Sequence, residues 1–362
     1  MRNVILLGLS IMLLLTACSY LNTSDTSDQR EGAMVEVAKV GTDNFEVIAE
    51  DLKIPWSIEK TGDTFYLSER TGGIVKIENG QVKKQNLELE KELATAAEAG
   101  FLGFVLSPDF KDTNLAYAYY TYVDESGQFN RIITLRVQGD TWKEEKLLLD
   151  KIPSGSRHHG GRIEIGPDGK LYATVGDAGD SALAQNLKSL GGKIVRMNLD
   201  GSIPSDNPLP NSYVYSYGHR NPQGMTWTSD GRMYASEHGN DANDEINLIV
   251  AGENYGWPVI EGKENQAEMV TPLFTSGPNS TWAPSGLTNM DGKLYAAALR
   301  GEAVLEFDLQ TKELQEIVTG LGRMRDVYLD GDYLYFISNN TDGRGTPTRN
   351  DDKLYRIQLI NE

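Results

Sequence analysis

A short turn-and-strand motif recurs along the whole chain and restricts the folds open to it. With small variations, it consists of Asp-Gly, one variable residue, an apolar residue and Tyr, followed by small or β-branched residues. Copies occupy residues 62–66, 168–172, 230–234, 291–295 and 330–335, and a divergent sixth copy occupies 109–117. Asp-Gly is a turn signal, and the alternation that follows it is typical of a strand. The motif therefore predicts repeated β units.

The spacing of the copies, roughly 40–60 residues, is typical of a four-stranded propeller blade. We therefore predict an all-β fold, a six-bladed β-propeller of four-stranded antiparallel blades, in a domain that spans residues 35–362. The alternative is a pair of β-sandwiches in which the Asp-Gly turns are coincidental. In the propeller, residues 353–359 are expected to pair with residues 45–49 and close the ring, which removes exposed sheet edges.

Helical periodicity is scarce in this chain. Residues 87–99 are the best candidate for a helix, because they are rich in Glu, Lys and Ala. The same composition suits an exposed loop, so both alternatives stay open.

The amino terminus has the layout of an export signal. A basic start precedes an apolar run, residues 4–15, that is too short to span a bilayer as a mature helix. The Leu-Thr-Ala-Cys sequence that follows resembles a lipoprotein box, which implies a signal peptide over residues 1–17 and lipidation of Cys18. The alternatives are a simple secretory signal and an uncleaved anchor. Residues 18–34 are expected to be a flexible tether between the cell membrane and an extracytoplasmic body.

Cysteine count and net charge limit what the exported body can be. Cys18 is the sole cysteine, so the body has no internal disulfide and must depend on its core. The formal net charge of the chain is -18, which argues against nucleic acid or an anionic lipid face as a partner. This charge suits a soluble body held at a membrane by its lipid, or a protein that binds calcium.

Residues 156–180 combine a polar cluster with a strand pair. The cluster contains Arg157, His158, His159 and Arg162, and the glycine pair within it allows a close approach to the backbone. A Pro-Asp-Gly turn and a regularly alternating strand then lead to a Gly-Asp pair. Because imidazoles and charged groups lie at the edge of a strand, we expect this segment to line the active site.

Loops at equivalent points of the other predicted blades carry similar groups. We expect these loops to converge at the mouth of the central channel; they are residues 98–100, 157–162, 218–224, 237–240, 299–301 and 322–326. They contribute Arg220, Arg300, Arg323 and Arg325, and a ring of guanidinium groups is unfavourable unless an anion lies among them. The alternative is that each arginine lies at the surface and pairs with a nearby carboxylate.

Several segments, in their order along the chain, resemble one family. The segments are HHGGR with GPDGKLYATVGD, YGHRNPQG, DEINLIVAGENYGWP and GRMRDV. From about residue 51 to the C-terminal strand, the chain resembles the soluble, PQQ-dependent aldose dehydrogenases of the glucose/sorbosone type, which are six-bladed propellers. The resemblance implies a quinoprotein that oxidises the C1 hydroxyl of an aldose to a lactone and passes electrons to a quinone or a carrier protein.

The resemblance also implies roles for individual residues. His158 matches the general base that takes the proton of the C1 hydroxyl while hydride moves to PQQ, and a mostly neutral imidazole suits this task. His159 is the alternative base. Arg220 matches the group that stabilises negative charge on the quinone oxygen. Further matched cofactor contacts are Asn221, Gln223, Thr281, Arg323 and Arg325, the last two as a grip on carboxylates.

Two calcium sites are implied in the same way. One uses the backbone carbonyls of Gly239 and Asn240 and bridges to PQQ, and the other pairs the carboxylate of Glu245 with the main-chain oxygen of Tyr255. Hard oxygen ligands of these kinds suit calcium, which polarises a quinone carbonyl as a Lewis acid. The alternative is a solvated acidic loop, which contains Asp241, Asp244, Glu245 and Glu253.

Three positions depart from the family pattern. Glu98 stands where a glutamine often contacts PQQ, Arg300 where a lysine is common, and Asn240 where a proline is common. A carboxylate that faces an anionic cofactor repels it unless the carboxylate is protonated or paired with an arginine. Arg300 retains the charge of lysine and Asn240 retains a backbone carbonyl, so these two changes are milder.

Two other functions stay open. The first is a lipid-anchored, calcium-stabilised propeller that binds a sugar or a partner without redox chemistry, because one fold hosts many functions. The second is a calcium-dependent, lactonase-like hydrolase, which requires a metal among carboxylates at the centre of the channel. The predicted arginine ring favours the dehydrogenase over both.

Overall fold

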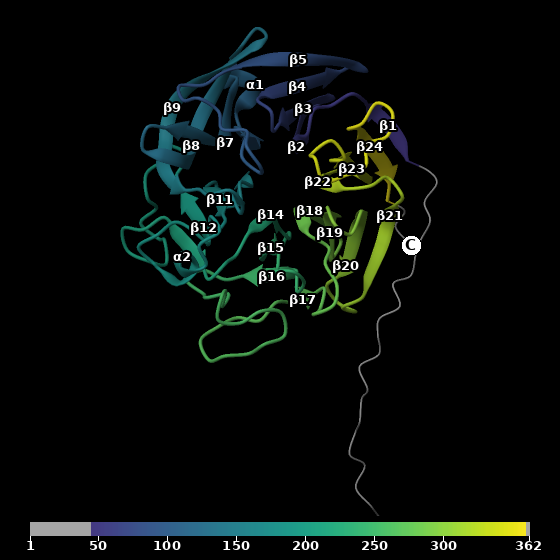
Figure 1. The fold of residues 1–362 in the computed structure, drawn as a ribbon. Coiled ribbons are helices and arrows are strands. Elements are labelled where there is room, and N and C mark those ends of the chain that lie inside the picture. Colours follow the sequence, from purple (N-terminus) through teal and green to yellow (C-terminus); the bar gives the residue numbers. More distant parts are fainter. Residues whose placement is uncertain (1–44, 360–362) are drawn as a thin grey trace, which may run out of the picture. The chain divides into compact units, whose positions relative to one another are not determined.

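The computed structural model describes residues 45–359, all of which lie in one compact unit. The 24 strands of these residues form six four-stranded antiparallel blades arranged round a common centre (Figure 1). The first strands of most neighbouring blades contact one another, so the first strands form the innermost layer. This arrangement confirms the predicted six-bladed β-propeller.

The blades follow one another along the chain. Blade 1 contains β2 (Pro55–Thr61), β3 (Thr64–Glu69), β4 (Gly73–Glu78) and β5 (Gln81–Glu88). Blade 2 contains β6 (Phe101–Leu106), β7 (Leu115–Asp124), β8 (Gly127–Gln138) and β9 (Thr141–Pro153). Blade 3 contains β10 (Ile163–Ile165), β11 (Leu171–Val175), β12 (Lys193–Met197) and β13 (Val214–Tyr217).

The second half of the ring repeats this arrangement. Blade 4 contains β14 (Pro222–Trp227), β15 (Met233–Glu237), β16 (Glu245–Ile249) and β17 (Phe274–Thr275). Blade 5 contains β18 (Pro284–Met290), β19 (Lys293–Ala298), β20 (Ala303–Asp308) and β21 (Leu314–Thr319). Blade 6 contains β22 (Met324–Asp330), β23 (Tyr333–Ser338), β24 (Leu354–Gln358) and β1 (Glu46–Ala49). The two short helices are α1 (Phe110–Thr113) and α2 (Ala182–Gln185).

The repeated motif forms the turn between the first and second strands of each blade. In blade 3, Gly169 of the turn has a φ of +70°, a left-handed conformation that favours glycine. The strand β11 follows, with Leu171, Ala173 and Val175 buried. The divergent copy precedes β7 and contains α1. Nearly all residues of the second strands are buried, which explains why apolar and aromatic side chains recur there.

The ring is closed by β1 and β24, which come from opposite ends of the described chain. These strands are antiparallel and pair Glu46 with Arg356 and Val47 with Tyr355, so the predicted closure is confirmed. Leu354 of β24 belongs to an apolar cluster that also contains side chains of blade 1, such as Leu67. Strand pairing and packing therefore tie the first blade to the last.

The outer strands of blades 1 and 2 also pair, in parallel, which the sequence did not predict. The pairing runs from Asn86 opposite Thr141 to Glu88 opposite Lys143. It joins the two blades into one eight-stranded sheet.

Residues 87–99 are the end of β5 and a loop, so the helix alternative is wrong and the loop alternative is confirmed. Leu93 of this loop forms an isolated bridge with Tyr122 of β7, and Leu87, Leu89 and Leu93 pack on the apolar cluster of blades 1 and 2. The apolar side chains thus anchor an extended segment on the neighbouring blade. This segment carries Glu98.

The expected signal peptide, the lipidated Cys18 and the tether lie outside the described residues, and their assignments stay predictions. Within residues 45–359, no helix has the length and apolar character needed to cross a membrane.

The closing strand provides a test of how much stability the ring gains from closure. Leu354 is fully buried, and replacing a buried leucine by alanine costs about 2–5 kcal/mol, so L354A should lower the free energy of unfolding by that amount in urea denaturation. Val47 lies in the partner strand but is 39% exposed, so V47A is the matched control and should change stability by about 0.5 kcal/mol or less. Equal effects of the two substitutions would contradict this account of closure.

Candidate active site

Loops from several blades meet over one cavity. Because adjacent strands of a blade run in opposite directions, the second-to-third-strand loop and the connection to the next blade lie at the same end of the blade. The cavity is lined from such loops and has a volume of about 600 Å³ including its open mouth. Predicted residues that line it are Glu98, His158, Arg220, Asn221, Gly239, Asn240, Thr281, Arg300 and Arg323.

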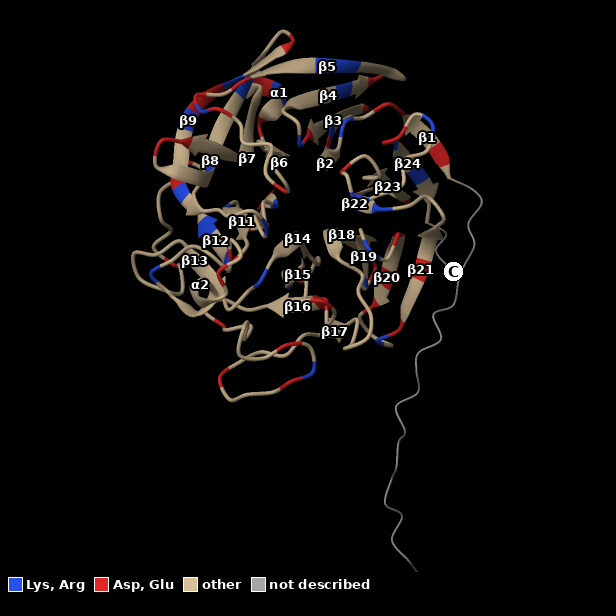
Figure 2. Cartoon of the chain, viewed as in Figure 1, with Lys and Arg blue, Asp and Glu red and all other residues tan. Residues whose placement is uncertain are grey.

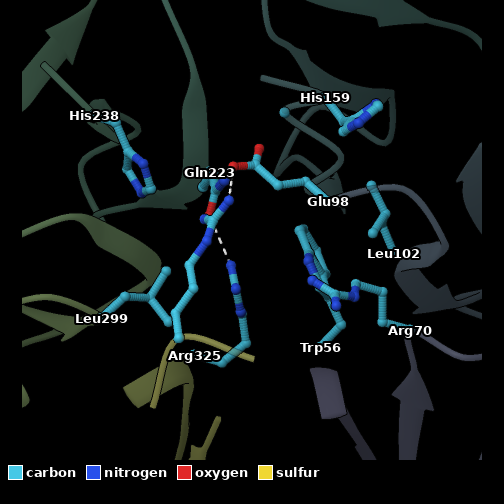
Figure 3. Close-up of a pocket in the computed structure, with 11 residues that line it drawn as sticks. Trp56, Arg70, Glu98, Leu102, His159, Gln223, His238, Leu299 and Arg325 are labelled. Carbon is cyan, nitrogen blue, oxygen red and sulfur yellow. Dashed lines mark hydrogen bonds and ion pairs between the residues drawn. The ribbon is translucent and has the colours of Figure 1, made fainter. Parts of the chain in front are cut away.

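The other predicted residues lie beside this cavity. Gln223 and Arg325 line a narrower space, with Trp56, Arg70 and His159, and this space shares Glu98 and other lining residues with the first (Figure 3). Glu245 and Tyr255 line a third space, which shares Arg220 and Gly239 with the first. The structure therefore brings together every predicted site residue that it describes.

His158 is held by a carboxylate. Its Nδ1 lies 2.7 Å from Oδ1 of Asp177. The same Oδ1 accepts a hydrogen bond from the Gly179 N–H at 2.8 Å, and Oδ2 of Asp177 accepts one from Trp257 Nε1 at 2.9 Å. Burial acts to raise the pKa of Asp177, but these donors outweigh it and lower the pKa. The ionised carboxylate fixes Nδ1 as the protonated nitrogen, so Nε2 of His158 is the nitrogen free to accept a proton.

The backbone of His158 is left-handed, with a φ of +59°. Such a conformation costs of order 1–3 kcal/mol for a residue other than glycine and persists only where its surroundings impose it. The packing here requires glycine at position 176, because a Cβ there would collide with the His158 carbonyl oxygen. The Gly-Asp pair that ends the alternating strand therefore serves both the backbone and the ring of His158.

His159 has different surroundings. Its Nδ1 lies 3.1 Å from Ser154 Oγ, its carbonyl accepts the Tyr119 hydroxyl, and its Nε2 is buried with no partner among the described residues. Burial lowers the pKa of His159 to about 4. His158, and not His159, shares the larger cavity with Arg220 and Asn221.

Arg220 is buried without a carboxylate partner among the described residues. Its guanidinium carbon lies 5.4 Å from the centre of the Trp257 ring, and its terminal nitrogens lie 3.3–3.4 Å from the carbonyl oxygens of Asn240 and His238. Its Nε is buried and has no partner in the part of the chain described. Burial lowers the pKa of Arg220. Trp257, which also bonds Asp177, thus connects Arg220 with the His158 pair.

Arg323 and Arg325 are both buried, two residues apart in the sequence, but they have different partners. Arg323 pairs with Asp342 at 2.9 Å. Arg325 donates to Asn339 Oδ1 at 3.0 Å and to Gln223 Oε1 at 2.9 Å, and the latter bond is drawn in Figure 3. Burial lowers the pKa of Arg325 to about 9. Asp342 acts to raise this pKa, whereas the neighbouring arginines lower it further. Arg325 therefore has only neutral partners among the described residues.

Glu98, the acid that stands where the family often has a glutamine, is paired with an arginine. This pairing is one of the two conditions under which a carboxylate there does not repel an anionic cofactor. Its Oε1 accepts a hydrogen bond from Arg344 Nη2 at 2.8 Å, and its Oε2 accepts the His158 N–H at 3.0 Å. Burial acts to raise the pKa of Glu98, but Arg344 and the His158 N–H lower it to about 2. The carboxylate is charged, and its charge is balanced by an arginine.

Thr281 and the acidic residue Asp244 belong to one buried network. Asp244 Oδ2 accepts the Thr281 hydroxyl at 2.7 Å and the Ala283 N–H at 2.8 Å, while Oδ1 accepts the Gly239 N–H at 2.9 Å. Asp244 is 2% exposed, so it is not part of a solvated loop. Asp241 is exposed, as the alternative expected. Asp244 thus fixes the main chain at Gly239 relative to Thr281.

Glu245 is a half-buried acid with limited compensation. It accepts hydrogen bonds from Asn247 Nδ2 and the Gly262 N–H, both at 3.0 Å, and the side-chain oxygen of Asn247 is buried without a partner among the described residues. Burial, and then Glu237, raises the pKa of Glu245 to about 8. Across residues 45–359, no group of three or more His, Cys, Asp or Glu side chains is placed to hold a metal ion.

Comparison with known proteins identifies the family. The glucose / sorbosone dehydrogenase family model matches residues 52–356. The chain belongs to this family. It is 35% identical over 282 residues to quinoprotein glucose dehydrogenase B of Acinetobacter calcoaceticus, covering 68% of this chain and 59% of that protein. It is 28% identical over 351 residues to aldose sugar dehydrogenase YliI of Escherichia coli, covering 84% of this chain and 92% of that protein.

A solved structure of the family has the same fold. The PQQ-bound form of aldose sugar dehydrogenase from Streptomyces coelicolor superposes with a TM-score of 0.81 and 36% sequence identity, covering 87% of this chain and 98% of that one. The match extends over essentially all blades. The cavity of the present protein therefore lies in the same propeller fold as that of the Streptomyces enzyme.

Four residues at the site were not assigned a role from the sequence: Asp177, Trp257, Asp342 and Arg344. A signal was available for Asp177, because it follows β11, whose partner β10 begins shortly after His158, and a carboxylate there can reach the imidazole. No signal was available for Arg344, whose partner Glu98 is 246 residues away in sequence.

The buried histidines predict how stability changes with pH. Because the pKa of His159 is about 4 in the folded protein and 6.5 in the unfolded chain, the unfolded chain binds the proton first as the pH falls. The free energy of unfolding therefore decreases from pH 6.5 to pH 4, by at most about 3 kcal/mol for this group. His238, whose pKa burial also lowers to about 4, acts in the same direction.

H159Q removes one of these two contributions. We expect urea denaturation at several pH values to show a smaller loss of stability between pH 6.5 and pH 4 in H159Q than in the wild type. An unchanged slope would contradict the assignment of a buried, neutral His159.

Proposed function

We propose that this protein is a PQQ-dependent dehydrogenase that oxidises the C1 hydroxyl of aldose sugars to lactones. The observation that carries the proposal is the juxtaposition of a carboxylate-held histidine, His158, with buried guanidinium groups that lack carboxylate partners among the described residues, Arg220 and Arg325. The first supplies a base, and the second favours an anionic ligand. Family membership and the PQQ bound in the Streptomyces relative support the same proposal.

The residues at the cavity fit PQQ, a tricarboxylate that carries a quinone. Arg300, Arg323 and Arg325 are the candidates for its carboxylates, although Arg323 and Arg325 already have partners in the protein. Arg220, whose Nε is buried without a partner, is the candidate for the quinone oxygen. Asn221, Gln223 and Thr281 each use one polar group within the protein and retain others for a cofactor.

The protein groups then have defined tasks. His158 Nε2 takes the proton of the C1 hydroxyl, and Asp177 stabilises the resulting imidazolium through Nδ1–H. The C1 hydrogen leaves with its electron pair as hydride, and a carbonyl forms at C1. When bound, PQQ supplies the acceptor for this hydride. Arg220, which lies over the Trp257 ring, holds positive charge at the site where negative charge develops.

The same proposal includes calcium. Gly239 and Asn240 line the cavity, and the Gly239 N–H is bonded to Asp244. The main-chain oxygens of these two residues are candidates for an ion that polarises the cofactor, with that of Asn240 also 3.3 Å from Arg220 Nη2. Glu245 and the carbonyl of Tyr255 are candidates for a second ion. The unpartnered oxygen of Asn247 beside Glu245 fits a cation at that place.

A second function has one specific observation in its favour. The donors of Arg323 and Arg325 are largely satisfied by Asp342, Asn339 and Gln223 in the protein alone. A lipid-anchored, calcium-stabilised propeller that binds a sugar or a partner without redox chemistry is therefore the alternative.

We further propose that Cys18 carries a lipid and holds the enzyme at the outer face of the cell membrane, where a quinone or a carrier protein accepts its electrons. The layout of residues 1–18 supports this location. Incorporation of labelled palmitate into the wild type and its loss in C18A test it.

Titration of the purified protein with PQQ and calcium tests the function directly. We expect saturable reduction of an artificial electron acceptor that depends on an aldose, on PQQ and on calcium, and that stops when a chelator removes the calcium. Binding of a sugar without reduction of the acceptor would favour the alternative function.

Substitution of the base separates chemistry from binding. H158Q should lower kcat by about 10²–10⁴-fold, because it removes proton transfer, while the Kd for PQQ changes little. H159Q is the matched control and should retain most of the turnover at neutral pH. Loss of turnover in H159Q together with activity in H158Q would move the role of base to His159.

A further inference from the structure

The main chain of His158 is held from both sides. On the carbonyl side, Gly176 packs closely and the Ala178 N–H donates to His158 O at 3.3 Å. On the amide side, the His158 N–H donates to Glu98 Oε2 at 3.0 Å. A left-handed residue such as His158, with a φ of +59°, relies on contacts of this kind to keep its conformation.

Glu98 is itself fixed by a third loop. Its other oxygen, Oε1, accepts the Arg344 Nη2–H at 2.8 Å, and Arg344 belongs to the loop between β23 and β24 of blade 6. The Glu98 side chain is 21% exposed and that of Arg344 is 59% exposed, so the pair lies on the solvent side of the cavity. One carboxylate therefore joins the loops that carry Glu98, His158 and Arg344.

We propose that Glu98 is a positioning residue for His158: it holds the backbone of the base while Asp177 holds its ring. Asp177 alone fixes the direction of Nδ1 but not the place of the Cα atom from which the ring extends. With both contacts, Nε2 is fixed relative to the cavity. A displacement of a base by about 1 Å costs on the order of 10²-fold in rate, so this second contact has a kinetic consequence.

The contacts of Glu98 distinguish this role from direct cofactor binding. Both carboxylate oxygens already accept donors of the protein, one from Arg344 and one from His158. A glutamine at this position can still accept the His158 N–H, but its amide nitrogen cannot pair with a guanidinium. A methionine of similar length has only a weakly accepting, uncharged sulfur, so it replaces neither the hydrogen bond to His158 nor the ion pair with Arg344. The pair E98Q and E98M therefore separates the bond to His158 from the ion pair.

The proposal rests on the proposed role of His158, but its first test does not depend on turnover. The chain has four histidines, so their Cε1–H signals are few in an NMR spectrum of the full chain without cofactor, and H158Q assigns that of His158. We expect E98M to shift or broaden the His158 signal and to leave that of His219, which Glu237 and Ser216 hold, unchanged. E98Q should restore the wild-type position.

Kinetics provide the second test. With saturating PQQ and calcium, E98M should lower kcat by about 10-fold or more with little change in the KM for sugar or the Kd for PQQ, whereas E98Q should stay within about 3-fold of the wild type. E78Q is the matched control, because Glu78 pairs with Lys76 at 2.9 Å on the surface of blade 1, and it should alter neither kcat nor the His158 signal. Equal loss in E98Q and E98M, or no loss in E98M, overturns the proposal.

A measurement on the wild type covers the case in which E98M does not fold. The His158 amide should exchange with solvent more slowly than that of Arg157, which makes none of these contacts, because Glu98 accepts a hydrogen bond from the His158 N–H. Equally fast exchange of the two amides overturns the proposal. If the wild type shows slow exchange and the expected NMR pattern but no turnover with PQQ, the proposed function fails and the positioning of His158 stands.

Discussion

The pairing of β1 with β24 is the constraint on which the site depends. It places the first-blade loops beside those of blade 6, although the two lie at opposite ends of the chain. Contacts across this junction include the Glu98–Arg344 ion pair and the hydrogen bond from the Ile58 N–H to Asp326 Oδ2. Without closure, the cavity would lack the loops that carry Arg323, Arg325 and Arg344 in a fixed relation to His158.

The charges of the cavity contrast with those of the chain. The formal net charge is -18, and acidic and basic residues are interspersed round the ring in the view of Figure 2. The buried arginines are thus not part of a general basic surface. Asp342 offsets Arg323, but Arg220 and Arg325 have only neutral partners among the described residues. Burying a cation without a counter-charge is unfavourable, so an anionic ligand gains affinity from relieving this state.

The fold was predictable because its signal is local and repeated. The Asp-Gly turn and the apolar strand after it lie within a few residues of one another, and each copy reports one blade. The parallel pairing of β5 with β9 was missed because it joins residues about 55 apart, such as Asn86 and Thr141, that share no pattern. The helix alternative over residues 87–99 failed because packing of Leu87, Leu89 and Leu93 on blade 2 outweighs the helical propensity of Glu, Lys and Ala.

The site divides in the same way. Residues in recognisable motifs, such as His158, Arg220 and Asn221, were predicted and share one cavity. Asp177, the partner of His158, and Asp342, the partner of Arg323, were not predicted, because an ion pair depends on tertiary contact and leaves little trace in sequence. Glu98 shows the consequence for interpretation. Taken alone, an acid in place of glutamine argues against an anionic cofactor.

Glu98 carries one negative charge and its partner Arg344 carries one positive charge. Together they give the same net charge around the cavity as a neutral glutamine with no arginine beside it. The pair also engages both carboxylate oxygens and holds the pKa of Glu98 near 2, which keeps this carboxylate ionised and bonded to the protein. A departure that weakens the case for cofactor binding in the sequence is therefore compatible with it in the structure, since its compensation comes from a blade that only ring closure brings into contact.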